Sequence, residues 1–543
     1  MWGLLVRFRG VSMLILLTGG GGVTGYAGKA LEGPVSLCGL LRAGLGADPD
    51  GLALISADTR WTRRTLDDLS DRLAAGLLGL GLEPGDRVAS LMPNRPALIV
   101  HYLACFKAGL VATPLNYRYM APEIDHALAV SGARVLLAHA EREEDLAASQ
   151  LARQLPLGTI SYGSTGRGAG PAFEDLIEGE ASSSPPPAPA PAAPAVIFFT
   201  SGSTGRPKGV THTHETLGWM LAAAAAGLEL SPADLLLAGS SLSHVGAFYV
   251  SFAALSAGAG VIVAQTFDGD ELLPLLREDH PTVLSMLPSA LFALTRDHGA
   301  RHGDFASLRL CRGAGDTVSA ELEREFAALS GFVIDEAYGL TEAGLVTVSP
   351  PSGQIKVGSV GQVVPAVALS IRNDDGQELP VGSEGRLWIN TPAATAGYWD
   401  DPGATEAAFS NGWLDSGDVM RADDEGYFYF CGRKKQIIVH DGSNICPQEV
   451  EGALLEHPGV ASAGVIGIHD LVHGENVRAY ITLTEGTARP ASQELIRFAR
   501  ARVGYKAPEE IVVLDHMPLT ATGKLDRTHL KQMAEANLAR GNQ

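Results

Sequence analysis

The ten residues TSGSTGRPKG, at positions 200–209, combine side chains that suit an anionic ligand. Three are glycines, four carry hydroxyl groups and one is a lysine, Lys208. Glycine lets backbone N–H groups approach an anion closely, hydroxyls add short donors, and lysine supplies a positive charge of the kind that binds phosphates. The apolar run 196–199 predicts a buried strand that leads into the segment. The pattern predicts a phosphate-binding loop, with a flexible surface loop as the alternative.

This segment departs from the Walker A P-loop, whose pattern is GxxxxGK[ST]. Pro207 stands where that motif requires glycine. Gly209 follows the lysine, where the motif requires serine or threonine. The expected loop therefore belongs to another class of phosphate site.

Residues 1–35 contain a second glycine-rich motif, Gly20-x-Gly22-x-x-Gly25, which has the spacing of a dinucleotide-binding loop. Such a loop opens a βαβ unit with an acidic residue about 20 positions later, at a strand end. Here Asp-Pro-Asp-Gly at 48–51 is typical of a turn instead. We interpret the motif as a chance match within an N-terminal extension.

The apolar run 11–17 in this extension is too short to cross a bilayer, which requires about 20 residues. Arg7 and Arg9 precede it, so a short signal-peptide core is one interpretation, although no clear cleavage site follows. An unstructured extension is the other, and Met13 could equally be the first residue. We expect no stable membrane span.

Composition and charge narrow the class of protein. The chain has 543 residues, of which 46% are hydrophobic, enough for a large core and two or three domains. A formal net charge of −20 argues against a general nucleic-acid partner, which needs a basic face. The five cysteines are odd in number and widely spaced, so we expect free thiols rather than disulfides or a zinc site.

Residues 36–432 alternate helical and strand patterns. Apolar residues recur at helical spacing over 66–81 and 95–109, and short apolar strands are expected at 86–92 and 133–139. This alternation predicts an α/β fold with a largely parallel sheet.

A proline-rich stretch, 181–195, could be read as a domain linker. Because it leads directly into the strand before the phosphate-binding loop, a surface connection is the simpler interpretation.

The pattern changes at Arg433, and residues 433–543 are long enough for a separate small domain. Strands are expected at 460–468, 477–484 and 511–515, with a helix at 492–502. This mixture predicts an α+β domain.

The order TSGSTGRPKG resembles the phosphate loop of the AMP-forming acyl-CoA synthetases, within the adenylate-forming superfamily. Four further segments resemble that family's motifs in the expected order. They are YGLTE at 338–342, WLDSGDV at 413–419, GRKKQIIVHDGSNICPQEVE at 432–451 and PLTATGKLDR at 518–527. The resemblance covers about residues 36–535. It implies a large N-terminal domain of layered α/β subdomains and a small, mobile C-terminal α+β domain.

The resemblance also implies roles for individual residues on the nucleotide. Thr341 would contact the α-phosphate and Glu342 would hold Mg²⁺. Asp418 would accept hydrogen bonds from the ribose hydroxyls, with Arg433 close to the ribose or the phosphates. The β- and γ-phosphates would be bound by Thr200, Ser201, Gly202, Ser203, Thr204, Gly205 and Lys208. The adenine site would be formed by Tyr338, which stacks on the base, with Gly339, Gly313, Ala314 and Gly315.

The remaining roles concern catalysis and domain movement. Lys524, after a glycine in a turn-like segment, would bridge the substrate carboxylate and the α-phosphate; a solvated surface lysine is the alternative. Lys435 would be the hinge, placed at 433–435, and Gly442 would line the tunnel for CoA. His244 corresponds to the histidine at the acyl pocket, although a lone histidine among apolar residues is more often a core residue.

By the resemblance, the chain is a ligase that uses ATP and Mg²⁺ to convert a carboxylic acid to acyl-AMP and then transfers the acyl group to CoA. The small residues 245–247 favour an aliphatic acid, so we expect a medium- or long-chain fatty acid. RGAG at 312–315 replaces the GGAP common in relatives, and Ser241 replaces a usual proline, which leaves the acid open. Gln436, where an acidic residue is common, and Ser416, in place of threonine, remove no catalytic group.

Two other functions remain open at this point. The acyl group could be loaded onto the thiol of a separate carrier protein, or the chain could bind a nucleotide without turnover. Because the reaction needs ATP and CoA, we expect a cytoplasmic protein, and a homodimer is compatible with the sequence.

Overall fold

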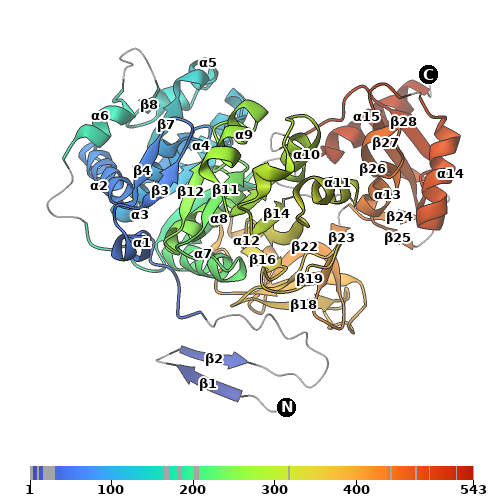
Figure 1. Cartoon of the computed structure of the whole chain (residues 1–543), viewed down its shortest axis with the longest axis horizontal. Helices are drawn as coiled ribbons and strands as arrows, with labels where there is room; N and C mark the ends of the chain where they lie inside the picture. Colours follow the sequence, from blue (N-terminus) through green and yellow to red (C-terminus); the bar gives the residue numbers. More distant parts are fainter. Residues whose placement is uncertain are drawn as a thin grey trace.

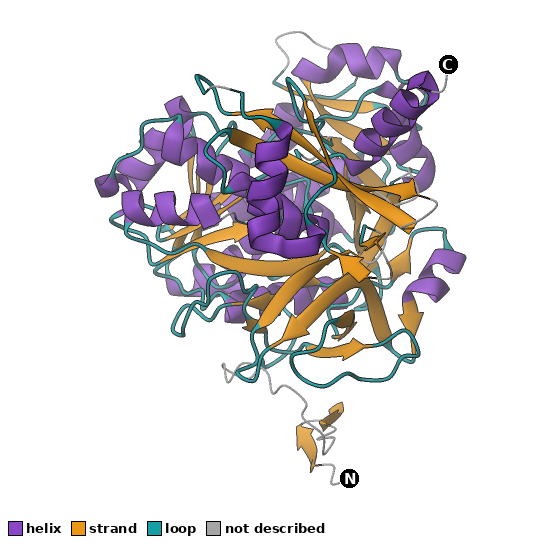
Figure 2. Ribbon diagram, turned by 90° about the vertical axis from the view of Figure 1, so that its right-hand side faces the viewer, coloured by secondary structure: helices purple, strands orange, loops and turns teal. Residues whose placement is uncertain are grey.

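The computed structural model describes residues 4–8, 11–15, 31–163, 170–180, 186–200, 207–315, 318, 320–433, 436–440, 443–470, 474–487, 489–520 and 523–541. Sheets flanked by helices dominate the chain (Figure 2), with a smaller C-terminal unit at one end (Figure 1). The expectation of an α/β fold is confirmed.

The predicted phosphate-binding segment joins two strands of a seven-stranded sheet. The four pairings from β9 to β8 are parallel, and β10 and β20 extend the sheet beyond β9 as antiparallel strands. In spatial order the strands are β20 (Gly397–Tyr398), β10 (Lys208–Thr213), β9 (Pro194–Thr200), β6 (Val111–Pro114), β5 (Arg87–Leu91), β7 (Val135–His139) and β8 (Thr159–Tyr162).

A nine-stranded sheet carries the second half of the large domain. Its central strands from β15 to β3 are parallel neighbours, and the strands at both edges are antiparallel. In order they are β17 (Gln362–Val363), β16 (Gly344–Val348), β15 (Asp335–Leu340), β14 (Leu310–Ala314), β13 (Val283–Met286), β11 (Leu235–Gly239), β12 (Gly260–Val263), β3 (Leu52–Ile55) and β4 (Arg60–Thr62).

Two smaller sheets complete the chain. One is antiparallel and contains β18 (Ala368–Arg372), β19 (Gly385–Asn390), β21 (Phe409–Ser410), β22 (Trp413–Ala422) and β23 (Phe428–Arg433). The other contains β24 (Ile438–His440), β25 (Ser443–Ile445), β26 (Val460–Asp470), β27 (Gly474–Leu483) and β28 (Glu510–Val513). The first sheet ends at Arg433 and the second begins at Ile438, and the domain boundary at 433 stays a prediction.

The helices follow apolar patterns and caps in the sequence. They are α1 (Arg42–Ala47), α2 (Arg63–Gly79), α3 (Pro96–Ala108), α4 (Ala121–Ser131), α5 (Glu143–Ala148), α6 (Phe173–Glu178), α7 (His214–Gly227), α8 (Val245–Ser256), α9 (Gly269–Asp279), α10 (Pro288–Arg296), α11 (Ala320–Ser330), α12 (Pro402–Ala408), α13 (Pro447–Leu455), α14 (Ser492–Val503) and α15 (Arg527–Gly541). Helix α3 illustrates the rule, since proline opens it and Gly109, with φ of 68°, ends it.

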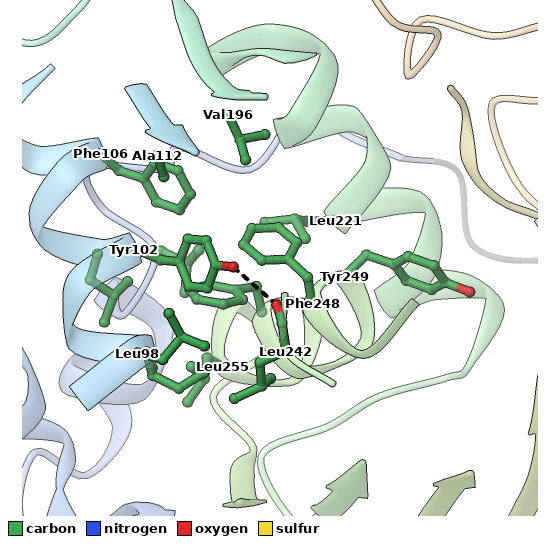
Figure 3. Close-up of a cluster of buried hydrophobic side chains, with 14 of the residues drawn as sticks. Leu98, Tyr102, Phe106, Ala112, Val196, Leu221, Leu242, Phe248, Tyr249 and Leu255 are labelled. Carbon is green, nitrogen blue, oxygen red and sulfur yellow. Dashed lines mark hydrogen bonds between the residues drawn. The ribbon is translucent and has the colours of Figure 1, made fainter. Parts of the chain in front are cut away.

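The largest core lies between the two main sheets, where α3 and α8 pack together (Figure 3). Rings of Tyr102, Phe248 and Phe252 meet there, with centroids 4.4–5.5 Å apart. The Tyr102 hydroxyl donates to the carbonyl of Leu242, 3.0 Å away. Because α8 is apolar on nearly every side, this core fixes the helix that starts beside His244.

Residues 4–8 and 11–15 form an antiparallel hairpin, β1 (Leu4–Phe8) with β2 (Val11–Ile15), where we expected an unstructured extension or a signal-peptide core. Among the described residues, none of the helices combines the length and apolar character needed to cross a membrane. The five cysteines are free, as their odd number predicts.

Candidate functional site

The predicted phosphate-binding segment connects two antiparallel strands. Thr200 is the last residue of β9, Lys208 is the first of β10, and the two are register partners. The predicted ligands Ser201, Gly202, Ser203, Thr204 and Gly205 lie outside the described residues. The segment therefore leaves and re-enters the same sheet edge, which differs from a strand-to-helix P-loop.

Thr341 is held at the end of β15 by a buried histidine. The Nε2 of His212 lies 2.8 Å from the carbonyl oxygen of Thr341, and Nδ1 lies 3.3 Å from the Thr216 hydroxyl. A carbonyl can only accept, so Nε2 carries the hydrogen. Burial lowers the pKa of His212 to about 4, so the ring stays neutral near pH 7. The pair fixes the backbone of the segment that also carries Glu342.

Glu342 lies in a small cluster drawn from three distant parts of the chain. The Tyr398 hydroxyl donates to its Oε1 at 2.9 Å, and the Nζ of Lys208 lies 5.0 Å from the centre of the Tyr398 ring. Burial, followed by the charge of Glu342, raises the pKa of Tyr398, so the phenol remains a donor. The cluster places one carboxylate beside the end of the predicted phosphate loop.

Asp418 is the buried carboxylate of the site. It is 2% exposed, its Oδ2 accepts from the Tyr338 hydroxyl at 2.6 Å, and its Oδ1 lies 3.1 Å from Nε of Arg433. That second contact is an ion pair without an aligned hydrogen bond, so Oδ1 still has room for a donor. Burial raises the pKa of Asp418, while Arg433 and Tyr338 oppose the rise.

The predicted adenine segment, residues 313–315, lies at the carboxyl end of β14. Gly313 and Ala314 are the last residues of β14, and Gly315 follows the strand with a φ of +88°, a value that favours glycine. Tyr338 stacks on Phe430 with ring centres 6.2 Å apart. Gly339 follows it in β15, so both parts of the predicted adenine site lie on neighbouring strands of one sheet.

Lys524 lies in a narrow turn between Leu519 and Leu525, which form an isolated bridge. Its backbone N–H donates to the Thr520 hydroxyl at 3.2 Å, and Gly523 before it has φ of +80°. The charge of this side chain affects the pKa of two groups in the large domain.

Burial is the main cause of the lowered pKa of His244, and the charge of Lys524 lowers that pKa further. Lys524 also lowers the pKa of Asp418, against the effect of burial. The charge of Lys524, in the C-terminal unit, thus acts on two residues of the large domain that lie 106 and 280 positions away in the sequence.

His244 has a local structural role as well as its predicted one. It is the N-cap residue of α8, and its Nδ1 accepts from the backbone N–H of Gly246 at 3.2 Å. Burial first, and Lys524 second, lower its pKa to about 4. The imidazole is therefore neutral near pH 7, with the hydrogen on Nε2, the nitrogen that Gly246 leaves free.

Three residues of the site were not found from the sequence. His212 and Tyr398 hold Thr341 and Glu342, as described above. Asn94 is 5% exposed and holds the segment before His244, since its amide donates to the Ser240 carbonyl at 2.9 Å and its Oδ1 accepts from Leu242 N–H at 2.8 Å. A polar residue in an otherwise apolar stretch was the available signal for Asn94, and the other two had none.

The hinge residue Lys435 and the tunnel residue Gly442 lie outside the described residues. Near them, Arg433 closes β23, and its carbonyl accepts from the N–H groups of Gln436 and Ile437. The positions of the hinge and of the CoA tunnel stay predictions.

Comparisons with known proteins agree with this geometry. Residues 41–399 match the AMP-binding enzyme family, and residues 449–524 match the AMP-binding enzyme C-terminal domain. The chain belongs to the AMP-binding enzyme family. This confirms the resemblance to AMP-forming acyl-CoA synthetases and makes the chain an enzyme of that kind.

Relatives of this AMP-binding enzyme are named as ligases of different acids. A feruloyl-CoA synthase of Amycolatopsis sp. is 35% identical over 88% of this chain and 94% of its own. A long-chain-fatty-acid–CoA ligase of Mycobacterium tuberculosis is 30% identical over 89% and 95%. ATP-bound MatB from Rhodopseudomonas palustris has a TM-score of 0.85 at 27% identity, covering 92% of this chain and 99% of that structure.

Proposed function

We propose that this enzyme joins a carboxylic acid to CoA at the expense of ATP, through an acyl-AMP intermediate. The observation that carries the proposal is that residues of three separate motifs meet, since Tyr338 donates to Asp418 and Tyr398 holds Glu342 beside Lys208. The charge of Lys524 also lowers the pKa of His244 and of Asp418. We propose that Lys524 joins the substrates bound at the acyl pocket and at the ribose carboxylate.

The first step brings a carboxylate against the α-phosphate of ATP, and two anions repel each other unless positive charge is near. We propose that Lys524 bridges the two, and that Lys208 holds the departing pyrophosphate with the 200–205 segment. Thr341, whose backbone is fixed by His212, would contact the α-phosphate. Asp418 would orient the ribose through its Oδ1, which still has room for a donor.

Glu342 is the residue that we propose for Mg²⁺. Across the described residues, no group of three or more His, Cys, Asp or Glu side chains is arranged to hold a metal ion by itself. Mg²⁺ often takes one or two carboxylates and completes its shell with water and substrate phosphates, so a single carboxylate near Lys208 fits. When bound, the ion would neutralise phosphate charge. Tyr398 would hold the carboxylate in place.

His244 would contribute without adding charge. Its neutral ring presents an Nε2 hydrogen at the start of α8, while Nδ1 is held by Gly246. A neutral donor beside the acid avoids a second cation in competition with Lys524. We propose that it orients the acyl group and excludes water from the reacting carboxyl.

For the second step, we propose that the small domain rotates about 433–435, withdraws Lys524 and admits CoA past Gly442. Hinge rotation of this kind is an established type of domain motion. Transfer to a carrier-protein thiol is the alternative for the same acyl-AMP.

The acid itself is not settled by the family. The expected fatty acid is named for one relative, and a feruloyl group for another, so the aliphatic assignment stays a prediction. A cytoplasmic location and a homodimer also stay predictions.

The test is product analysis by mass spectrometry with purified enzyme, ATP, Mg²⁺, CoA and a panel of fatty, aromatic and dicarboxylic acids. We expect an acyl-CoA and AMP in equal amounts, both lost in Lys524→Ala and retained in Lys531→Ala, an exposed lysine of α15. Acyl-AMP without acyl-CoA would replace CoA by a carrier protein. AMP formation that survives in Lys524→Ala would overturn the proposed role of this lysine.

A further inference from the structure

Arg312 is a buried charge with unused hydrogen-bond donors. It is 1% exposed, and its Nη2 donates to the Tyr249 hydroxyl at 2.7 Å. Its Nε and Nη1 are buried without any hydrogen-bond partner. A buried donor left unsatisfied costs about 1–3 kcal/mol, and more when it is charged, so such a pair of nitrogens invites an acceptor from outside the chain.

The register of the nine-stranded sheet shows which way this side chain points. Ala238 on β11, Ser285 on β13 and Arg312 on β14 are successive partners across parallel strands, so they share one face. Leu310, two residues before Arg312, joins the core that contains α8, whereas Cys311 joins the core on the opposite face. Arg312 therefore faces α8.

The same row lies at the carboxyl end of the parallel strands, where open α/β sheets bind their ligands. Tyr249 is on α8, about one turn after the N-cap His244. Figure 3 shows its ring at the margin of the apolar cluster, with the hydroxyl directed away from it. The Arg312 guanidinium, which contacts this hydroxyl, thus lies next to α8, whose N-cap is the predicted acyl-pocket residue His244.

The carboxylate at the partner position on the neighbouring strand does not neutralise Arg312 by contact. Asp335 is the register partner of Arg312 on β15, but among the described residues the two form neither a hydrogen bond nor an ion pair within 4.0 Å. One Asp335 oxygen accepts from Ser349 N–H at 3.2 Å and the other has no partner. A buried charge without a contacting counter-charge is costly, which again favours a ligand.

We propose that Arg312 determines acid specificity, and that the acid carries, at the end remote from its reacting carboxyl, a second oxygen acceptor that Arg312 binds. This inference rests on the proposed ligase function and narrows its substrate class. The acceptor is a carboxylate or a phenolic oxygen. The replacement of GGAP by RGAG at 312–315 is thus the change that determines which acid is bound. An unsubstituted fatty acid fits poorly, because its methyl end would leave two buried N–H groups of Arg312 unsatisfied.

The experiment compares matched acids by their rate of acid-dependent ATP–pyrophosphate exchange. One set is 3-phenylpropanoate with its 4-hydroxy and 4-carboxy derivatives, and the other is octanoate with octanedioate. In the wild type we expect kcat/KM to be roughly tenfold to a hundredfold higher for the best acceptor-bearing acid than for its hydrocarbon match. The hydroxy and carboxy members distinguish a phenolic from a carboxylate acceptor.

Arg312→Met keeps the volume and removes the donors, so the ratio between matched acids should fall to about one while hydrocarbon acids remain substrates. Tyr249→Phe removes only the hydroxyl that orients Arg312 and should lower the ratio by a smaller factor. A ratio within one variant does not depend on how much protein is folded. Should Arg312→Met fail to fold, the wild-type ratio and Tyr249→Phe still decide.

Equal use of matched acids by the wild type, or an unchanged ratio in the variants, would overturn the inference and leave the ligase function intact. A uniform loss for every acid would assign Arg312 a structural role instead. If none of the acids, polar or apolar, supports exchange in the wild type, the proposed function itself fails.

Discussion

The nucleotide side and the acid side of this site are prepared in different ways. On the nucleotide side, three of the residues that we assign to ATP are held in place by other residues of the protein. Tyr338 donates to Asp418, Tyr398 donates to Glu342, and His212 holds the carbonyl of Thr341. These groups are fixed before the substrate arrives, which is the arrangement expected where transition-state charge must be stabilised without rearrangement.

On the acid side, donors are left without partners. Arg312 has two unpartnered nitrogens, and the Ser243 hydroxyl beside His244 is also buried without a hydrogen bond. The difference indicates that the shared chemistry of ATP is built into the fold, whereas the features that select the acid are completed by the acid itself. Variants should therefore affect all acids alike on the first side and only some acids on the second.

Among the variants that test this contrast, Asp418→Asn should have the largest effect. The amide keeps the shape of the side chain but loses the charge that faces Arg433 and the oxygen proposed for the ribose. Hydrogen bonds to charged groups contribute about 1.5–3 kcal/mol each, so kcat/KM for ATP should fall roughly a hundredfold in the exchange assay.

The matched control for this variant is Asp424→Asn, in an exposed turn, which should behave as the wild type. The loss must be the same for every acid in the panel. A loss confined to some acids would contradict the division between the two sides.

Much of this fold could be expected from the sequence because its signals are local. The helix expected over 95–109 is α3, bounded by the proline and glycine that predict its ends, and the strand expected over 133–139 is β7. The helix expected over 66–81 begins earlier, at Arg63, because Thr62 caps it through the backbone N–H of Thr65.

The site was predictable where it depends on motifs and hidden where it depends on tertiary contacts. The spacing in YGLTE indicates Thr341 and Glu342, yet no pattern links either to His212, or Glu342 to Tyr398, far along the chain. Those pairs form only when β10, β15 and β20 are assembled. Arg312 was noticed as a departure from relatives, but its unpartnered state follows from burial, which a single sequence does not reveal.

A smaller effect is expected for Tyr398→Phe, which removes the hydroxyl that holds Glu342. The carboxylate then has more freedom, so we expect kcat to fall about threefold to tenfold and the Mg²⁺ concentration for half-maximal rate to rise by a similar factor. Titration of the exchange rate with Mg²⁺ measures both.

Tyr429→Phe is the matched control. Tyr429 lies on β23, and its hydroxyl donates to Asp423 at 3.1 Å rather than to Glu342. The Mg²⁺ requirement of this control should not change. If Tyr398→Phe leaves the Mg²⁺ requirement at its wild-type value, the assignment of Glu342 to the metal is wrong.

The smallest effect on turnover, and the sharpest view of the acid side, comes from Asp335→Asn. Burial is the largest influence and raises the pKa of Asp335 from 3.8 to about 7, although Arg312 and Ser349 oppose it. Between about pH 4 and pH 7 the unfolded chain therefore binds fewer protons than the folded one. The free energy of unfolding must fall through this group as the pH rises across that window.

Asparagine does not ionise, so Asp335→Asn should gain stability relative to the wild type as the pH rises from 5 to 8. We expect a relative gain of roughly 1–3 kcal/mol, since a tenfold difference in ionisation corresponds to about 1.4 kcal/mol. Denaturant melts at several pH values measure it, with Asp375→Asn, an exposed substitution, as the control. If Asp335→Asn shows no relative gain in stability, Asp335 is ionised and neutralises Arg312 in the folded state. The acid side would then be as well partnered as the nucleotide side, and the contrast between them would fail.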